Sequence, residues 1–299
     1  MHPAALFEST IPALDLIARG KVRDIYAIDK KHLLIVATDR LSAYDVILPD
    51  PIPGKGEVLT QISNFWFHMM EDIVPNHLSS RPLNTVISDH PALCAKLANQ
   101  STVVKRLRPL PIEAVVRGYL IGSGWRDYQL HGEICGHRLP PCLQQASQLP
   151  EPIFTPATKA AAGSHDQNIN MHQAETLLGA DLAGRVRKIS LQIFKRATAY
   201  AIHRNIIIAD TKFEFGLDDA GILHIIDEIL TPDSSRFWPA AEYKTGISPP
   251  SLDKQCVRDF LDTLDWDRSA PGPALPAKLL KQTGKNYRKV WHTLAADAG

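Results

Sequence analysis

Four charged residues, Asp210, Lys212, Glu214 and Asp227, stand in a stretch that is otherwise rich in apolar side chains. Side chains two positions apart in a strand share a face, so the first three form one row. A second strand that returns antiparallel would bring Asp227 towards that row. Two carboxylates that face each other repel unless a cation lies between them, and oxygen ligands beside a lysine suit Mg²⁺ serving a phosphorylated substrate. The spacing favours a metal and phosphate site; a salt-bridged surface sheet is the alternative.

Two strands must position these residues, and the sequence predicts both. Asp and Gly at residues 218–221 supply the backbone angles of a tight turn, and residues 222–230 read as the returning strand. Directly afterwards comes TPDSSR, which contains Asp233 and Arg236. Short hydroxyl side chains, an acid and an arginine are typical of a phosphate-binding segment.

Two earlier segments carry further charges beside predicted strands. Gly20, Lys21 and Arg23 place two cations at a strand bend, where a glycine lets the backbone approach a phosphate. A plain hairpin with solvated charges is the alternative there. Asp45, in TDRLSAYD, either caps a turn or holds a polar ligand.

Arg117 stands in an otherwise apolar strand, and a buried guanidinium requires an anion. Glu113 is one candidate partner within the protein, and a bound ligand is the other. Ser123 follows in a Gly-Ser-Gly segment that leads into a predicted helix, whose first N–H groups can receive an anion. Residues 132–165 are rich in Pro and read as poor in regular structure, with Lys159 near their end.

Helical periodicity is clearest in the middle and at the end of the chain. It predicts helices over residues 57–73 and 185–204, another that begins at residue 251, and a last one that ends near residue 294. With strands dominating the first part of the chain, we expect an α+β fold of two lobes.

The 299 residues suffice for two lobes, and the net charge of +1 neither requires nor excludes a nucleic-acid partner. The four cysteines lack zinc-site spacing, which indicates reduced thiols in a cytoplasmic protein. We expect no signal peptide and no membrane span, because no apolar run is long enough.

Several segments together resemble the SAICAR synthetase family of purine biosynthesis, in its longer form. The matching segments, in the family's order, are GKVRDIY, DRLSAYD, LPIEAVVRGYLIGSG, TPATKAAAGSHDQNI, ADTKFEFG, DEILTPDSSRFW and SLDKQCVRDFL. The resemblance implies an ATP-dependent ligase that joins L-aspartate to the carboxylate of carboxyaminoimidazole ribonucleotide. It also implies a two-lobed fold of antiparallel sheets with packed helices, related to the lobes of kinases and ATP-grasp enzymes, with residues 1–108 in one lobe and 109–299 in the other.

The resemblance also implies roles for the residues. Glu214 and Asp227 would bind Mg²⁺, and Lys212 would lie near the transferred phosphoryl group. ATP would contact Gly20, Lys21, Arg23, Lys105 and Leu107. The ribonucleotide would contact Arg117, Ser123, Lys159, His165, Arg236 and Arg258. The acids Asp45, Asp210 and Asp233 would lie near the imidazole amine or the incoming aspartate ammonium.

The expected partners are therefore small molecules, with no nucleic acid and no membrane, and resemblance to the longer form suggests a monomer. Two other functions remain open on the residues alone. A small-molecule kinase would use the same Mg²⁺ and ATP apparatus without aspartate. A non-catalytic nucleotide sensor would bind ATP without turnover, although it would not need Lys212, Glu214 and Asp227 together.

Overall fold

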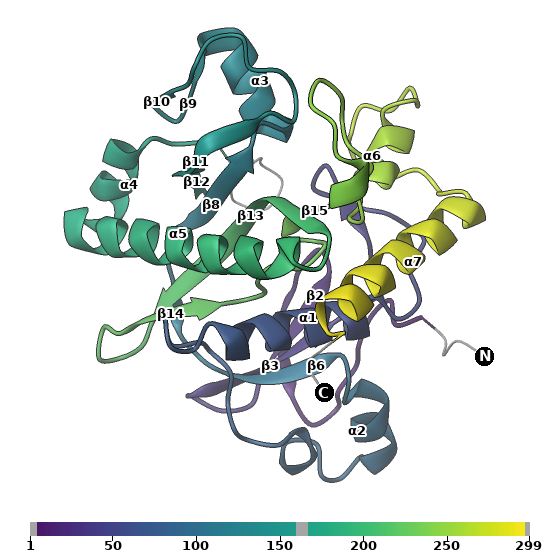
Figure 1. Ribbon diagram of the computed structural model, residues 1–299. Helices are drawn as coiled ribbons and strands as arrows, with labels where there is room; N and C mark the ends of the chain where they lie inside the picture. The colour runs from purple at the N-terminus through teal and green to yellow at the C-terminus, as the bar shows by residue number, and fades with distance from the viewer. Residues whose placement is uncertain (1–4, 160–166, 297–299) are drawn as a thin grey trace. The chain divides into compact units, whose positions relative to one another are not determined.

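The computed structural model describes residues 5–159 and 167–296 (Figure 1). The chain divides into two units. Unit 1 is drawn from Met1–His68, Asn76–Leu107 and Asp253–Gly299, and unit 2 from Met69–Pro75 and Arg108–Leu252. Both contain antiparallel sheet and helices, as the α+β prediction requires.

Unit 1 is built on a four-stranded antiparallel sheet in the order β1-β2-β3-β6. Alternate residues of the central strands are buried, among them Tyr26, Leu34 and Val36, and they form one core with Leu97 and Val103. The elements of the N-terminal part are β1 (Asp15–Arg19), β2 (Arg23–Ala27), β3 (His32–Ala37), β4 (Ser42–Ala43), β5 (Val46–Ile47), α1 (Lys55–Met69), η1 (Leu83–Thr85), α2 (Pro91–Leu97) and β6 (Ser101–Lys105).

The two C-terminal helices belong to unit 1, which corrects the expected grouping of residues 109–299 in one lobe. These helices are α6 (Gln255–Leu261) and α7 (Ala277–Leu294). Val257 and Leu261 of α6 are buried in a cluster with Leu41, Leu48 and Ile52. This apolar contact groups the end of the chain with its beginning, and local periodicity carries no information about such a distant partner.

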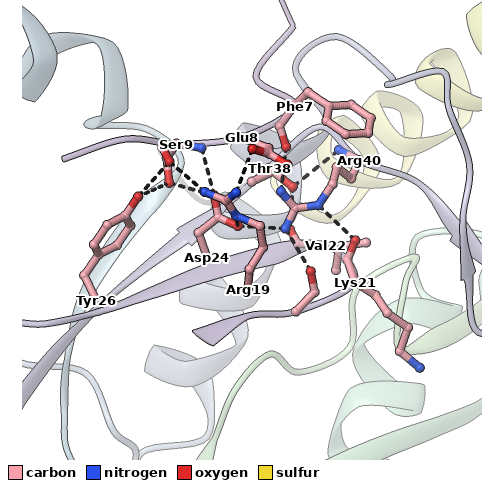
Figure 2. A network of polar contacts seen from close by, with 11 residues as sticks. Phe7, Glu8, Ser9, Arg19, Lys21, Val22, Asp24, Tyr26, Thr38 and Arg40 are labelled. Carbon is pink, nitrogen blue, oxygen red and sulfur yellow. Dashed lines mark hydrogen bonds and ion pairs between the residues drawn. The ribbon is translucent and has the colours of Figure 1, made fainter. Parts of the chain in front are cut away.

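A buried ion pair ties the start of the chain to the unit 1 sheet (Figure 2). The Asp24 carboxylate accepts hydrogen bonds from the Ser9 amide and hydroxyl, both at 2.8 Å, and pairs with Arg40 at 2.8 Å. Burial by itself raises the pKa of Asp24, but the bonds from Ser9 and Arg40 outweigh it and hold that pKa below 3.8.

We expect Asp24→Asn to lower the free energy of unfolding at pH 7 by about 3–5 kcal/mol, because it leaves a buried guanidinium without its carboxylate. The native pKa is depressed, so this stabilisation is present above pH 3.8 and is lost as the pH falls through the native pKa. Urea unfolding of both proteins should therefore show a difference that is full at pH 7 and shrinks below pH 3.8. An equal difference at acidic and neutral pH would contradict this account of Asp24.

Unit 2 is built on a larger antiparallel sheet in the order β11-β8-β13-β14, in which β12 also pairs with β8, and β15 and β7 with β13. Its strands are β7 (Arg108–Pro109), β8 (Ile112–Tyr119), β9 (Glu133–Ile134), β10 (His137–Arg138), β11 (Gln148–Phe154), β12 (Ala157–Thr158), β13 (Ile206–Leu217), β14 (Leu223–Ile226) and β15 (Ser235–Pro239). Its helices are α3 (Gly122–His131), α4 (Met171–Leu178), α5 (Ala180–Ile202) and η2 (Ala240–Glu242). The region 132–165, expected to be poor in regular structure, contributes the sheet strand β11.

Helix α5 lies across this sheet (Figure 1). Its buried residues Val186, Ile193 and Ala197 recur at helical spacing, as predicted. Gly118 of β8 permits the close approach, since a Cβ there would lie 3.0 Å from the Phe194 ring. The helix thereby supports the strands that carry the charged row.

Candidate functional site

The charged row predicted on β13 is present. Phe213 and Phe215 are buried, whereas the alternate residues Lys212 and Glu214 are partly exposed, as expected for a strand with one buried face. Strand β8 lies alongside with Arg117 directly opposite Asp210. The two strands therefore present their charged side chains on a shared face.

The returning strand is shorter than predicted. Strand β14 ends at Ile226, which pairs with Glu214, and Asp227 has a left-handed backbone with φ of 70°. An aspartate tolerates this conformation better than most residues, but it ends the regular alternation of the strand. Residues 227–230 are therefore not strand, and the direction of Asp227 is set by this bend.

Three carboxylates and two ammonium groups gather at one end of the row. The Lys212 ammonium donates to Glu113 at 2.5 Å, and the Lys159 ammonium donates to Glu214 at 2.6 Å. Burial lowers the pKa of Lys212, but the negative charges of Glu113, Glu214 and Asp227 outweigh it and raise that pKa above its ordinary value. Counted as three acids against two bases, these five side chains carry one excess negative charge, which favours a bound cation.

Glu214 and Asp227 fit the donor chemistry of Mg²⁺, which is usually bound through one or two carboxylates together with substrate phosphates. Both carboxylates lie near enough to the Lys212 ammonium for their charges to raise its pKa. Within residues 5–159 and 167–296, no three His, Cys, Asp or Glu side chains form a ready metal cluster. A divalent ion at this place would complete its shell with water and with oxygens of a phosphorylated substrate.

A second cluster, at the position of Asp210, has the opposite balance. Arg117 and Asp210 are both 4 % exposed, and their side chains pair at 3.3 Å. Arg236 also donates to Asp210, at 2.5 Å, and Arg117 donates to the Ser123 hydroxyl at 2.9 Å. Counted over these side chains alone, two guanidinium groups against one carboxylate leave one excess positive charge, which favours a bound anion. Asp127 adds a negative charge that also raises the pKa of Arg117.

The pKa of Arg117 responds to both neighbours. Burial lowers that pKa, the Asp210 carboxylate raises it, and the Arg236 charge lowers it. Because the two guanidinium groups repel each other, an anion that contacted both would relieve this repulsion. Gly122 leaves room for the arrangement, since a Cβ there would lie 2.6 Å from an Arg236 nitrogen.

The alternative in which Glu113 satisfies Arg117 is not what the structure shows. Glu113 pairs with Lys212, and Arg117 with Asp210, Ser123 and Thr155. Four residues along an extended strand separate Cα atoms by about 13 Å, so Glu113 and Arg117 share a face without meeting. Their partners come from the neighbouring strand.

In unit 1 the Gly20–Arg23 segment forms the turn between β1 and β2, with the Gly20 amide donating to the Arg23 carbonyl at 2.8 Å. Lys21 forms an ion pair with Asp45. The sequence predicted that Lys21 contacts ATP and that Asp45 lies near an amine group, and the structure pairs these two side chains with each other.

The turn that carries Asp45 is held by the C-terminal part of the chain. Tyr44 and Asp45 both have left-handed backbones, with φ of 51° and 64°. The Tyr44 hydroxyl donates to the Asp262 carboxylate at 2.8 Å, and the Arg268 guanidinium lies 4.2 Å from the Tyr44 ring centre. Burial and Asp262 raise the pKa of Tyr44 to about 12, so this hydroxyl remains a donor at neutral pH.

The structure gives the remaining predicted residues other partners, and one of them lies outside the described residues. Lys105 is the last residue of β6, and its amide donates to the His77 carbonyl at 2.7 Å. Leu107 ends the segment Asn76–Leu107 of unit 1. Arg258, in α6 of unit 1, pairs with Asp253 at 3.0 Å. Asp233 lies in the turn before β15, where its amide donates to the Thr231 hydroxyl at 3.2 Å. His165 is outside the described residues.

Sequence reasoning missed two side chains at the clusters. Glu113, which holds Lys212, was considered only as a partner for Arg117, and Thr155, which accepts from Arg117 at 3.0 Å, was not considered. Glu113 could have been identified as a site residue, because it lies in the same predicted strand and on the same face as Arg117. Nothing in the sequence indicated that Thr155 belongs to the site, because its position depends on the pairing of β11 with β8.

The chain is similar to known proteins over almost its whole length. The model of the SAICAR synthetase family matches residues 16–273. Phosphoribosylaminoimidazole-succinocarboxamide synthase of Methylococcus capsulatus is 59 % identical over 99 % of both chains, and that of Thioalkalivibrio sulfidiphilus is 61 % identical over 95 % of this chain and 96 % of its own.

Solved structures lead to the same family. A SAICAR synthase of Saccharomyces cerevisiae, described as complexed with SAICAR, superposes with a TM-score of 0.89 at 40 % identity, covering 98 % of this chain and 99 % of its own. A SAICAR synthetase described as a complex with ADP has a TM-score of 0.69 at 25 % identity, covering 94 % and 97 %. The expected α+β fold is confirmed, and the chain belongs to the SAICAR synthetase family.

Proposed function

We propose that this chain uses the two charge clusters on β8 and β13 to perform the reaction of its family. That reaction joins L-aspartate to the carboxylate of carboxyaminoimidazole ribonucleotide at the expense of ATP, and it yields SAICAR, ADP and phosphate. The observation that carries the assignment is the adjacency of a negative cluster at Glu214 and a positive cluster at Asp210. They are four residues apart on one strand, about 13 Å between Cα atoms, so a phosphoryl donor and an anionic acceptor would bind beside each other on the same face.

The chemistry explains why both clusters are needed. A carboxylate is a poor electrophile, so its oxygen first attacks the γ-phosphorus of ATP, which releases ADP and forms an acyl phosphate. The aspartate amine then attacks the acyl carbon, phosphate leaves, and the nitrogen loses a proton to phosphate, water or a nearby carboxylate. Positioning and charge neutralisation dominate such a phosphoryl transfer.

We assign the roles from this balance of charge. Glu214 and Asp227 would hold Mg²⁺, which would neutralise phosphoryl oxygens. Lys212, kept protonated by its three acidic neighbours, orients the transferred group. From unit 1 we assign Gly20, Lys21 and Arg23 to the triphosphate, and Lys105 and Leu107 to adenine.

The ribonucleotide residues follow from the positive cluster. Arg117, Ser123 and Arg236 would bind its carboxylate or 5′-phosphate, with Lys159, His165 and Arg258 as further contacts. Asp45, Asp210 and Asp233 would serve the amine groups. Asp210 also pairs with both guanidinium groups of the cluster, so it would hold them in place for the ribonucleotide.

We further propose a monomeric cytoplasmic enzyme. All four cysteines are free thiols, which suits a reducing compartment. The monomeric state rests on the resemblance to the longer form of the family. In the described part of the chain, no helix has the length and apolar character needed to cross a membrane.

A coupled assay of ADP release, in which each of the three substrates is omitted in turn, tests the function. We expect ADP only when ATP, L-aspartate and carboxyaminoimidazole ribonucleotide are all present, because the amine must remove the acyl phosphate for turnover. Sustained ADP release without aspartate would indicate a kinase instead. Tight ATP binding without turnover would indicate a sensor.

A further inference from the structure

Beneath the Gly20–Arg23 turn lies a buried arginine that takes no part in the proposed chemistry. Arg40 is 1 % exposed, and its guanidinium donates to four oxygens (Figure 2). Its Nε donates to the Lys21 carbonyl at 3.1 Å, and its Nη2 to the Gly20 carbonyl at 2.9 Å and to Asp24 at 2.8 Å. Its Nη1 donates to the Phe7 carbonyl at 2.6 Å.

The next carbonyl of the turn, that of Val22, is bound by Thr38, two residues before Arg40. The Val22 carbonyl accepts from the Thr38 amide at 2.9 Å and from the Thr38 hydroxyl at 2.8 Å. Three successive carbonyls, of Gly20, Lys21 and Val22, are therefore bound by groups of residues 38–40. The backbone of the turn is thereby held at three consecutive points.

This arrangement determines where the amides of the turn point. In a planar trans peptide, the N–H of a residue is directed opposite the carbonyl of the residue before it. The carbonyls of Gly20 and Lys21 face the guanidinium, so the amides of Lys21 and Val22 are directed away from it. Successive amides that face one side make a concave site for an anion such as phosphate.

Arginine suits this position for a physical reason. Its planar guanidinium keeps its charge when buried and carries donors in a fixed fork, which can bind two successive carbonyls and a carboxylate together. Asp24 compensates the charge and is itself held by Ser9. A lysine would place a single ammonium there, with three donors and no fork to bridge the same acceptors.

We propose that Arg40 is a positioning residue for ATP: by holding the Gly20 and Lys21 carbonyls from below, it aims the amides of the turn and the base of the Lys21 side chain at the triphosphate. This inference rests on the proposed function, because that function places the triphosphate at Gly20–Arg23. Arg40 itself touches no substrate.

The test compares two variants that weaken the same Asp24 network at different ends. Arg40→Lys keeps a positive charge beside Asp24 but loses at least one carbonyl of the turn. We expect it to raise the KM for ATP about tenfold, the effect of losing one hydrogen bond to a charged group, and to leave the KM for aspartate within about twofold.

Ser9→Ala is the matched control. It removes a hydroxyl that donates to Asp24 at 2.8 Å, but it does not touch the carbonyls of the turn. A purely structural role for the network predicts the same change in the KM for ATP in both variants once thermal unfolding shows them folded, and that result would overturn the proposal.

Thr38→Val decides the matter if Arg40→Lys does not fold. It removes the hydroxyl bond to the Val22 carbonyl and leaves the Thr38 amide bond in place, so we expect a smaller rise in the KM for ATP, about threefold, in a folded protein. No rise relative to Ser9→Ala would again overturn the proposal. Calorimetric titration of ATP into each variant measures the same ranking without turnover. The positioning role is thereby judged even if the wild-type protein fails the three-substrate assay, which would count against the proposed function alone.

Discussion

We expect that replacing Glu214 by Gln lowers kcat by about a thousandfold, because we assign this carboxylate to the Mg²⁺ ion that would neutralise the phosphoryl oxygens of ATP. The amide keeps the shape of the side chain but removes its negative charge, so the cluster of three acids and two bases loses its excess negative charge. Because a carboxylate that raises the pKa of Lys212 is lost as well, the ammonium is held less firmly. Steady-state kinetics should also show a higher Mg²⁺ concentration at half-maximal rate.

Asp219→Asn is the control for this experiment. Asp219 is an exposed carboxylate in the turn of the same hairpin, so the substitution makes the same change in charge away from the clusters. We expect its kcat and Mg²⁺ dependence to match those of the wild-type protein. If Glu214→Gln behaved like this control in both respects, Glu214 would not belong to the metal site.

Arg236→Ala raises the KM for the ribonucleotide, or lowers kcat, by about thirtyfold, with the KM for ATP within about twofold of wild type. The substitution removes the guanidinium that faces Arg117 across Asp210, so the cluster loses its excess positive charge and much of its attraction for an anion. Asp210 retains Arg117 as its partner, which should preserve the fold.

Arg196→Ala provides the comparison, because Arg196 forms an exposed ion pair with Asp72 in the same unit, and such pairs contribute little to stability. We expect unchanged kinetics for all three substrates in this variant. Equal loss of ribonucleotide and ATP affinity in Arg236→Ala would instead assign Arg236 to the nucleotide, and the positive cluster would need another ligand.

Much of the candidate site could be predicted because strands have a period of two. That period places Lys212 and Glu214 on one face and Phe213 on the other, whatever the rest of the chain does. The turn at residues 218–221 could likewise be predicted, because Gly221 adopts a φ of 76° that few other residues tolerate. The family could also be recognised from the sequence, because its motifs are short contiguous segments.

Cross-strand pairing could not be read in this way. Glu113 and Arg117 looked like partners in the sequence, but each pairs with a residue of β13 about a hundred positions away. Which residues meet depends on the register of β8 against β13, and register is set when the sheet forms. The bend at Asp227, which ends β14 early, was not visible in an apolar stretch that favours strand throughout.

The sequence by itself therefore determined the family, the charged row and the chemical character of the site, because each depends on residue types and on short-range periodicity. The tertiary structure decided the rest. It divided the charges into a negative and a positive cluster, packed the C-terminal helices into unit 1, and placed Arg40 beneath the turn at Gly20. Such outcomes depend on contacts between residues far apart in the chain, which form only when apolar surfaces are buried together and buried charges find partners.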